Sequence, residues 1–305
     1  MKFNWQGVMP AVTTQFNSND ELDLDMFKVN IKAQLAAGVQ GIVLGGTLGE
    51  ASTLTEEEGR TLTRETVATV AGRIPVLMNI AEQTTKAAIA LAKSAKEDGA
   101  SGLMMLPPMR YKASDAEIVH YFKSVANSTS LPIMIYNNPV DYKLVVTLDM
   151  FQELLDACPN IQAVKESTRD TTNITRIKNR FGNRLAIMTG VDTLALESLV
   201  LGADGWVAGL VDAFPVETVA IYKLIKAGRV QEAITIYRWF MPLLELDIHP
   251  KLVQYIKMAA VYTGIGNEYV RAPRLVLEGA ERVRIEKVIT DALAIRPTLP
   301  DYKNL

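Results

Sequence analysis

The stretch AAGVQGIVLGG, residues 36–46, joins the end of a helical segment, a glycine and a short apolar run. Related phrases recur as EDGASGLMMLPP at residues 97–108 and LGADGWVAGL at residues 201–210. A glycine just past a helix adopts the left-handed conformation that ends the helix. A short run that is apolar throughout is typical of a parallel strand covered on both faces. These phrases therefore predict repeated units in which a helix feeds a buried parallel strand.

Eight apolar runs of this kind occur along the chain, and segments with helical periodicity, such as 24–37 and 55–70, separate them. Eight alternating units predict a (β/α)8 TIM barrel, with an open doubly wound sheet as the alternative. The predicted strands are residues 8–14, 41–46, 74–80, 101–108, 131–139, 161–167, 184–190 and 204–210.

The pattern changes after the eighth run. Four helical segments follow, at 215–227, 229–245, 250–263 and 281–295, separated by Pro and Gly turns. The first of them can serve as the last barrel helix. We therefore predict a catalytic barrel over residues 1–227 and a C-terminal helical region over residues 228–305.

The composition narrows the class of protein. The chain has 305 residues, 49% hydrophobic and 22% charged, and a formal net charge of −2. That balance predicts neither a nucleic-acid partner nor a membrane partner. Cys158 is the sole cysteine, and the start MKFNWQGVMP lacks the pattern of a signal peptide. We expect a cytoplasmic enzyme with a small-molecule substrate.

In such barrels the active site lies at the carboxyl ends of the strands. The sixth run, QAVKES at 162–167, ends there with Lys165 after two apolar residues. Desolvation favours the neutral amine of a lysine, and a neutral amine is what imine formation with a ketone requires. The alternative is a structural Lys165 that pairs with Glu166 or extends along the barrel rim.

Two further strand ends carry candidate groups. Tyr136 ends the fifth run, beside the lysine strand, so it could move a proton or be a core tyrosine with a satisfied hydroxyl. The loop GGTLGE, 45–50, offers backbone N–H groups and the Thr47 hydroxyl to an anion, and a carboxylate fits better than a nucleotide. The two histidines, His120 and His249, lie at no strand end, so no metal site is expected.

Four motifs in order, GGTLGE, YNNP, VKES and TGVD, resemble the dihydrodipicolinate synthase and N-acetylneuraminate lyase superfamily over essentially the whole chain. The resemblance implies an imine-forming Lys165, a proton-relaying Tyr136, a relay hydroxyl on Thr47, no cofactor other than the lysine imine, and a homotetramer. It also implies a substrate-binding set made of Gly46, Thr47, Leu48, Gly190 and Val207.

The chain departs from the synthase pattern at three places. Leu48 stands where synthases usually have a second threonine, and Asp141 stands where they have the arginine that binds the carboxylate of the aldehyde substrate. Met109 takes the aligned place of an interface tyrosine, and Tyr111 lies two residues on. The interface relay is then incomplete or rerouted. Met109, Tyr111, Asn138 and Asp141 are added to the predicted substrate-binding set, and Arg110 has no assigned role.

LPPMRY, YNNPVDY and ALAIRP resemble most the Δ1-pyrroline-4-hydroxy-2-carboxylate deaminases of that superfamily. This implies deamination and dehydration of that cyclic imine to 2,5-dioxopentanoate and ammonia. Three alternatives stay open within the superfamily: a pyruvate-releasing aldolase or lyase, a dehydratase of keto-deoxy sugar acids, and dihydrodipicolinate synthase. A non-catalytic protein that binds a keto acid is the alternative from another class.

Overall fold

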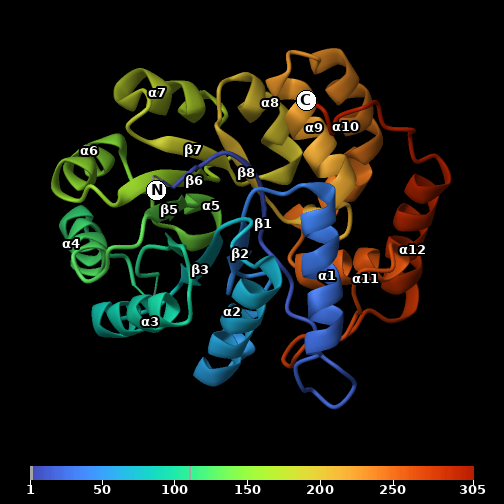
Figure 1. Ribbon diagram of the computed structural model, residues 1–305, viewed down its shortest axis with the longest axis horizontal. Helices are drawn as coiled ribbons and strands as arrows, with labels where there is room; N and C mark the ends of the chain where they lie inside the picture. Colours follow the sequence, from blue (N-terminus) through green and yellow to red (C-terminus); the bar gives the residue numbers. More distant parts are fainter. Residues whose placement is uncertain (1–2, 110) are drawn as a thin grey trace.

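A computed structural model describes residues 3–109 and 111–305, and within these ranges eight strands form one parallel sheet (Figure 1). Their spatial order is β1-β8-β7-β6-β5-β4-β3-β2, and a bridge between Ala11 and Val43 links the two ends of that order. The predicted barrel is confirmed, because a doubly wound sheet would reverse its strand order partway. The strands are β1 (Gly7–Pro10), β2 (Ile42–Leu44), β3 (Val76–Ile80), β4 (Gly102–Met105), β5 (Ile133–Asn137), β6 (Ile161–Glu166), β7 (Ala186–Thr189) and β8 (Gly205–Ala208).

Helices cover the outside of the barrel (Figure 1). Gly38, Gly99 and Gly202, which mark the three related phrases, have φ angles of 92°, 93° and 108°. Each therefore ends its helix in the left-handed region, as predicted. The outer helices are α1 (Leu24–Ala37), α2 (Glu56–Val70), α3 (Thr85–Glu97), α4 (Asp115–Ala126), α6 (Leu148–Ala157), α7 (Thr172–Phe181), α8 (Ala195–Val200) and α9 (Pro215–Lys226), whereas the single turn α5 (Pro139–Tyr142) directly follows β5.

Several strands end earlier than predicted. β1 stops at Pro10 rather than residue 14, and β4 stops at Met105 rather than residue 108. The apolar character continues past the last paired residue because the first residues of the following loops are buried as well. These loops carry most of the candidate site residues.

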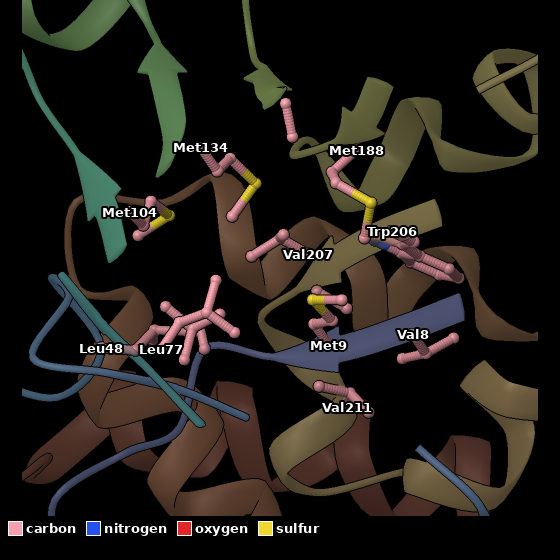
Figure 2. Close-up of a cluster of buried hydrophobic side chains, with 14 of the residues drawn as sticks. Val8, Met9, Leu48, Leu77, Met104, Met134, Met188, Trp206, Val207 and Val211 are labelled. Atoms are coloured by element: carbon pink, nitrogen blue, oxygen red, sulfur yellow. The ribbon is translucent and has the colours of Figure 1, made fainter. Parts of the chain in front are cut away.

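The barrel interior below the mouth is filled by side chains rather than open. Figure 2 shows Met9, Met134 and Val207 close together there, with Met188 beside Trp206. Gly205 leaves room for this packing, because a Cβ at that position would lie 2.4 Å from Met188 Cε. Methionine suits such irregular space because its unbranched thioether adapts its shape.

Four helical segments follow the barrel: α10 (Val230–Leu244), the 3-10 turn η4 (Glu245–Ile248), α11 (Leu252–Tyr262) and α12 (Gly279–Ala294). α10 packs on α9, and α12 packs across α10 and α11 at the outer edge of the molecule (Figure 1). The division at residues 227 and 228 stays a prediction. None of the helices in the described ranges is long and apolar enough to cross a membrane.

Candidate active site

A pocket of about 260 Å³ opens at the carboxyl ends of the strands. It brings together ten of the eleven residues that the sequence indicates, from β2, β4, β5, β6, β7 and β8 or the loops that follow them. These residues are Gly46, Thr47, Leu48, Met109, Tyr136, Asn138, Asp141, Lys165, Gly190 and Val207.

Lys165 lies near the end of β6, paired in register with Tyr136 of β5. Its side chain is 7% exposed, and its Nζ lies 4.1 Å from the centre of the Tyr136 ring. Burial lowers the pKa of Lys165, and nearby Tyr142 and Asp247 oppose that change. The amine therefore has a larger neutral fraction than an exposed lysine, which suits a nucleophile.

Pairing of Lys165 with Glu166, the structural alternative, is not formed. The Glu166 carboxylate points the other way and accepts hydrogen bonds from the Thr168 backbone N–H at 2.8 Å and from Asn173 Nδ2 at 2.9 Å. Alternate residues of a strand face opposite sides, so neighbours along β6 are directed apart. Lys165 is left facing the pocket without that partner.

The Tyr136 hydroxyl belongs to a short polar chain on the pocket wall. Asn138 Nδ2 donates to Tyr136 Oη at 3.1 Å and to Asp141 Oδ2 at 2.7 Å. Arg169 Nη2 lies 3.7 Å from Asp141 Oδ1. Burial raises the pKa of Tyr136 to about 12, so the phenol is protonated at neutral pH. It can donate a proton while its oxygen accepts from Asn138.

The loop after β2 supplies the anion-binding side. Gly45 has a φ of 68°, and its carbonyl accepts a hydrogen bond from Asn79 Nδ2 at 2.9 Å. A Cβ on Gly46 would meet open space, so its backbone faces the pocket unobstructed. Thr47 Oγ1 lies 3.3 Å from Tyr142 Oη. The exposed backbone amides and this hydroxyl fit a carboxylate.

The same loop is anchored from the C-terminal region. Lys257 Nζ of α11 lies 2.7 Å from Glu50 Oε1, and both side chains are fully buried. The Arg271 backbone N–H donates to Glu50 Oε2 at 3.1 Å, and Arg274 Nη1 lies 3.7 Å from the same oxygen. Glu50, which the sequence analysis gave no role, therefore fixes the base of the carboxylate loop.

The structure adds pocket residues that the sequence analysis missed: Tyr142, Arg169, Asp247 and Arg274. Asp247 comes from η4 and lies against Gly209, where a Cβ would be 2.1 Å from Asp247 Oδ1. Burial raises the pKa of Asp247 well above the usual value for an aspartate, and Asp192 raises it further. Tyr142 had one usable signal, its place in YNNPVDY, whereas nothing near Asp247 in the sequence marks it.

Gly190 has no room for a side chain. A Cβ there would lie 2.3 Å from Ser167 Oγ and 2.6 Å from Lys165 Cε. A glycine at this strand end is therefore what leaves space for the lysine side chain and for a bound ligand beside it.

Some predicted positions lie elsewhere. Tyr111 is 54% exposed and lies beside Glu117, so it does not line the pocket of its own chain. Arg110 is outside the described residues. His120 is exposed on α4, and His249 stacks on Tyr255 with ring centres 4.7 Å apart. Residues 3–109 and 111–305 contain no group of three or more His, Cys, Asp or Glu side chains able to hold a metal ion.

Comparison with known proteins adds to this geometry. The family model described as "Dihydrodipicolinate synthetase family" matches residues 4–292. A 4-hydroxy-tetrahydrodipicolinate synthase of Exiguobacterium sibiricum is 34% identical over 276 residues, which cover 90% of this chain and 92% of that protein. A synthase of the same name from Methanoculleus marisnigri is 30% identical and covers 94% and 99% of the two chains.

Solved structures agree with the sequence relatives. The 4-hydroxy-tetrahydrodipicolinate synthase of Methylacidiphilum fumariolicum SolV has a TM-score of 0.89 at 27% identity, covering 95% of this chain and 97% of that one. A chloride-inhibited dihydrodipicolinate synthase of Acinetobacter baumannii, solved with pyruvate, has a TM-score of 0.88 at 26% identity, covering 94% and 98%.

Proposed function

The chain belongs to the dihydrodipicolinate synthetase family, and from that premise we propose that Lys165 forms a covalent imine with a small 2-keto or 2-imino acid. Enzymes of this family use a lysine Schiff base with pyruvate and need no external cofactor. The observation that carries the proposal is the buried Lys165 amine, free of Glu166 and facing a pocket with a carboxylate-binding loop.

Each pocket wall has a role in this proposal. The backbone of Gly46, Thr47 and Leu48 holds the substrate carboxylate, which places the C2 carbon over Lys165. Tyr136 and Thr47 supply hydroxyls for proton transfer during imine formation. Gly190 and Val207 border the bound acid. Met109, Asn138 and Asp141 lie on the side where the rest of the substrate extends.

For the substrate we propose Δ1-pyrroline-4-hydroxy-2-carboxylate. Asp141 and Asp247 both line the pocket, and Arg169, which also lines it, is already paired with Asp141. Two acidic side chains in the pocket lining disfavour a second substrate carboxylate and favour hydroxyl or amino groups. Lys165 would attack C2 of the cyclic imine, the ring would open, and the enamine would expel the 4-hydroxyl as water. Hydrolysis then yields 2,5-dioxopentanoate and ammonia.

Asp247 supports elimination in particular. A leaving hydroxyl departs as water only if it receives a proton, and the raised pKa of Asp247 favours the protonated carboxyl that can give one. The carboxyl lies next to Gly209 and belongs to η4 of the C-terminal region.

The test is an assay with Δ1-pyrroline-4-hydroxy-2-carboxylate coupled to a 2,5-dioxopentanoate dehydrogenase, with Lys165→Ala as the control. We expect NAD(P)H formation that depends on Lys165, together with ammonia release. The absence of both signals from folded wild-type protein would reject this substrate while leaving the imine proposal intact.

Dihydrodipicolinate synthase activity is the second candidate, because the relatives compared above carry that name. It requires that Arg169 leave Asp141 to bind the carboxylate of the aldehyde substrate. Pyruvate consumption that depends on added aldehyde, measured in parallel, would favour the synthase. Pyruvate release from a sugar-derived keto acid, detected with lactate dehydrogenase, would favour an aldolase.

A keto-acid-binding protein without activity is distinguished by borohydride trapping. Wild-type protein incubated with pyruvate and reduced should gain the mass of the adduct, and Lys165→Ala should not. We further propose a cytoplasmic homotetramer, because the family resemblance implies one. Light scattering coupled to size exclusion would test the tetramer.

A further inference from the structure

Tyr142 contributes a second phenol to the pocket. It is the last residue of α5, and its hydroxyl lies 3.3 Å from Thr47 Oγ1. Its ring meets the Tyr136 ring edge to face, with centres 5.7 Å apart and planes at 87°. Both rings line the pocket together with Lys165. Three hydroxyls and one amine therefore surround the place where a keto acid would bind.

The position of Tyr142 is set by its own backbone. Asn138 begins the single turn of α5, and its Oδ1 accepts from the Asp141 N–H at 3.3 Å. The Tyr142 N–H donates to the Asn138 carbonyl at 3.1 Å, and Lys143 ends the turn with a φ of 61°. A residue held by this turn lies back over the end of β5. The ring is thereby directed to the loop that carries Thr47.

The two phenols differ in their relation to Lys165. The Lys165 amine lies over the face of the Tyr136 ring, and the Tyr136 hydroxyl accepts from Asn138. Burial lowers the pKa of Lys165, and of the neighbouring groups that oppose this change Tyr142 has the largest influence, ahead of Asp247. Burial raises the pKa of Tyr142 to about 12, so this phenol also holds its proton at neutral pH.

The other candidate on this wall cannot replace it. Met109 lines the same pocket, but its thioether has no proton to give. The Tyr142 phenol does carry such a proton, and its hydroxyl lies within hydrogen-bond distance of Thr47 Oγ1.

We propose that Tyr142 is a catalytic residue that exchanges protons with the Lys165 adduct, with Thr47 as its hydrogen-bond partner. The inference rests on the imine function proposed for Lys165. The neutral amine adds to the keto carbon, and an amine proton passes to the keto oxygen to give a carbinolamine. The C–O bond then breaks as Tyr142 gives its proton to that oxygen, so water leaves and a protonated imine and a phenolate remain. The phenolate next takes a proton from C3, which gives the neutral enamine and restores the phenol.

The test follows the C3 step directly. Wild-type protein with pyruvate in D2O should exchange the methyl protons for deuterium, which proton NMR records. Tyr142→Phe keeps the ring and removes the hydroxyl, and we expect exchange to slow by about 100-fold, within the usual range for one general acid–base group. The equilibrium amount of borohydride-trapped adduct should change little. Tyr262→Phe is the matched control and should exchange at the wild-type rate, because Tyr262 ends α11, donates to Glu286 of α12 and does not line the pocket.

Thr47 provides a second variant for the same inference. Thr47→Val removes the partner hydroxyl, and combining it with Tyr142→Phe should slow exchange no further than Tyr142→Phe alone, because both act on one proton path. Fully additive losses, or wild-type exchange by folded Tyr142→Phe, would overturn the role of Tyr142. Failure of the wild-type protein to form any trapped adduct would instead reject the proposed function itself.

Discussion

Lys165 and Lys257 are both buried lysines, yet only Lys257 is held by a carboxylate. Lys257 is fully buried, bonds Glu50 at 2.7 Å and also donates to the Tyr269 carbonyl. Lys165 is 7% exposed and lies over the Tyr136 ring, with no ion pair to another described residue. Burial lowers the pKa of both lysines, and Glu50 counteracts the effect at Lys257.

The difference separates a reactive lysine from a structural one. A buried ammonium is tolerated when a carboxylate neutralises it, whereas an unpaired one tends to lose its proton. The ion pair between Lys257 and Glu50 connects the C-terminal helices to the loop that ends at Glu50, so the charge of Lys257 has a structural role. Lys165 faces a pocket that is open to ligand, so its neutral amine can react.

The largest expected effect is loss of activity in Lys165→Ala. Removal of the covalent nucleophile should lower the turnover rate by about 10⁴-fold or more and abolish borohydride trapping. The far-UV circular dichroism should match that of the wild type, because the cavity lies at the open mouth of the barrel. An adduct that survives this substitution would assign the nucleophile to another residue.

Lys257→Met should lower the stability of the fold, in contrast to the loss of activity expected for Lys165→Ala. It leaves the buried Glu50 carboxylate without its nearer cation, with Arg274 3.7 Å away, and we expect a cost of about 3 kcal/mol in the free energy of unfolding. Urea denaturation would measure the loss.

Lys257→Met combined with Glu50→Gln is the control for that prediction. It removes the orphaned charge and should recover part of the lost stability, because the cost comes from leaving one partner alone. If the single and double variants were equally unstable, the charge pair would not explain the effect.

Lys165→Met should change the free energy of unfolding in the opposite direction to Lys257→Met. Replacing an unpaired buried lysine by an apolar side chain of similar length should leave stability unchanged or raise it, by about 1–4 kcal/mol at most. In the wild type, the pKa of Lys165 is lower in the folded state than its ordinary value of 10.5. Burial of the charged amine therefore destabilises the wild type fully below the folded-state pKa, and this destabilisation disappears as the pH rises to 10.5. The gap between Lys165→Met and wild type should therefore narrow with rising pH in that window.

An exposed lysine gives the smallest effect and calibrates the others. Lys287 is 74% exposed in its side chain and pairs with Asp291 one turn later on α12. Such pairs contribute little because water screens them. Lys287→Ala should leave the urea midpoint and the trapping yield unchanged within error, and a large shift in either would question the comparison between buried and exposed lysines.

The two buried lysines also differ in whether their burial can be predicted from the sequence. Lys165 follows two apolar residues at the end of a predicted strand, where the barrel rule places active sites. Lys257 lies within LVQYIKMAAVY, residues 252–262, and looks like an ordinary polar residue of an amphipathic helix. Its burial depends on packing against Glu50, which is 207 positions away along the chain.

The sequence likewise predicts the pocket position of some candidate site residues and misplaces one. Residues in strand-end motifs, including Thr47, Tyr136 and Gly190, were found by combining the strand count with the resemblance, and they meet in one pocket. Tyr111 was placed by counting along a loop, and the loop carries it outside that pocket. Loop geometry has no period, so sequence spacing does not give the direction of a side chain there.

The sequence by itself determined the eight repeated units, the glycine turns that end their helices and the strand-end position of Lys165. These features follow from short-range rules: backbone conformation, apolar runs and the shared polarity of parallel strands. Only the tertiary structure decided that Asp247 joins the pocket, that Lys257 holds Glu50 and that Tyr142 reaches Thr47. Those contacts join residues far apart in the chain, and they exist only because the packed barrel brings its loops and C-terminal helices to one mouth.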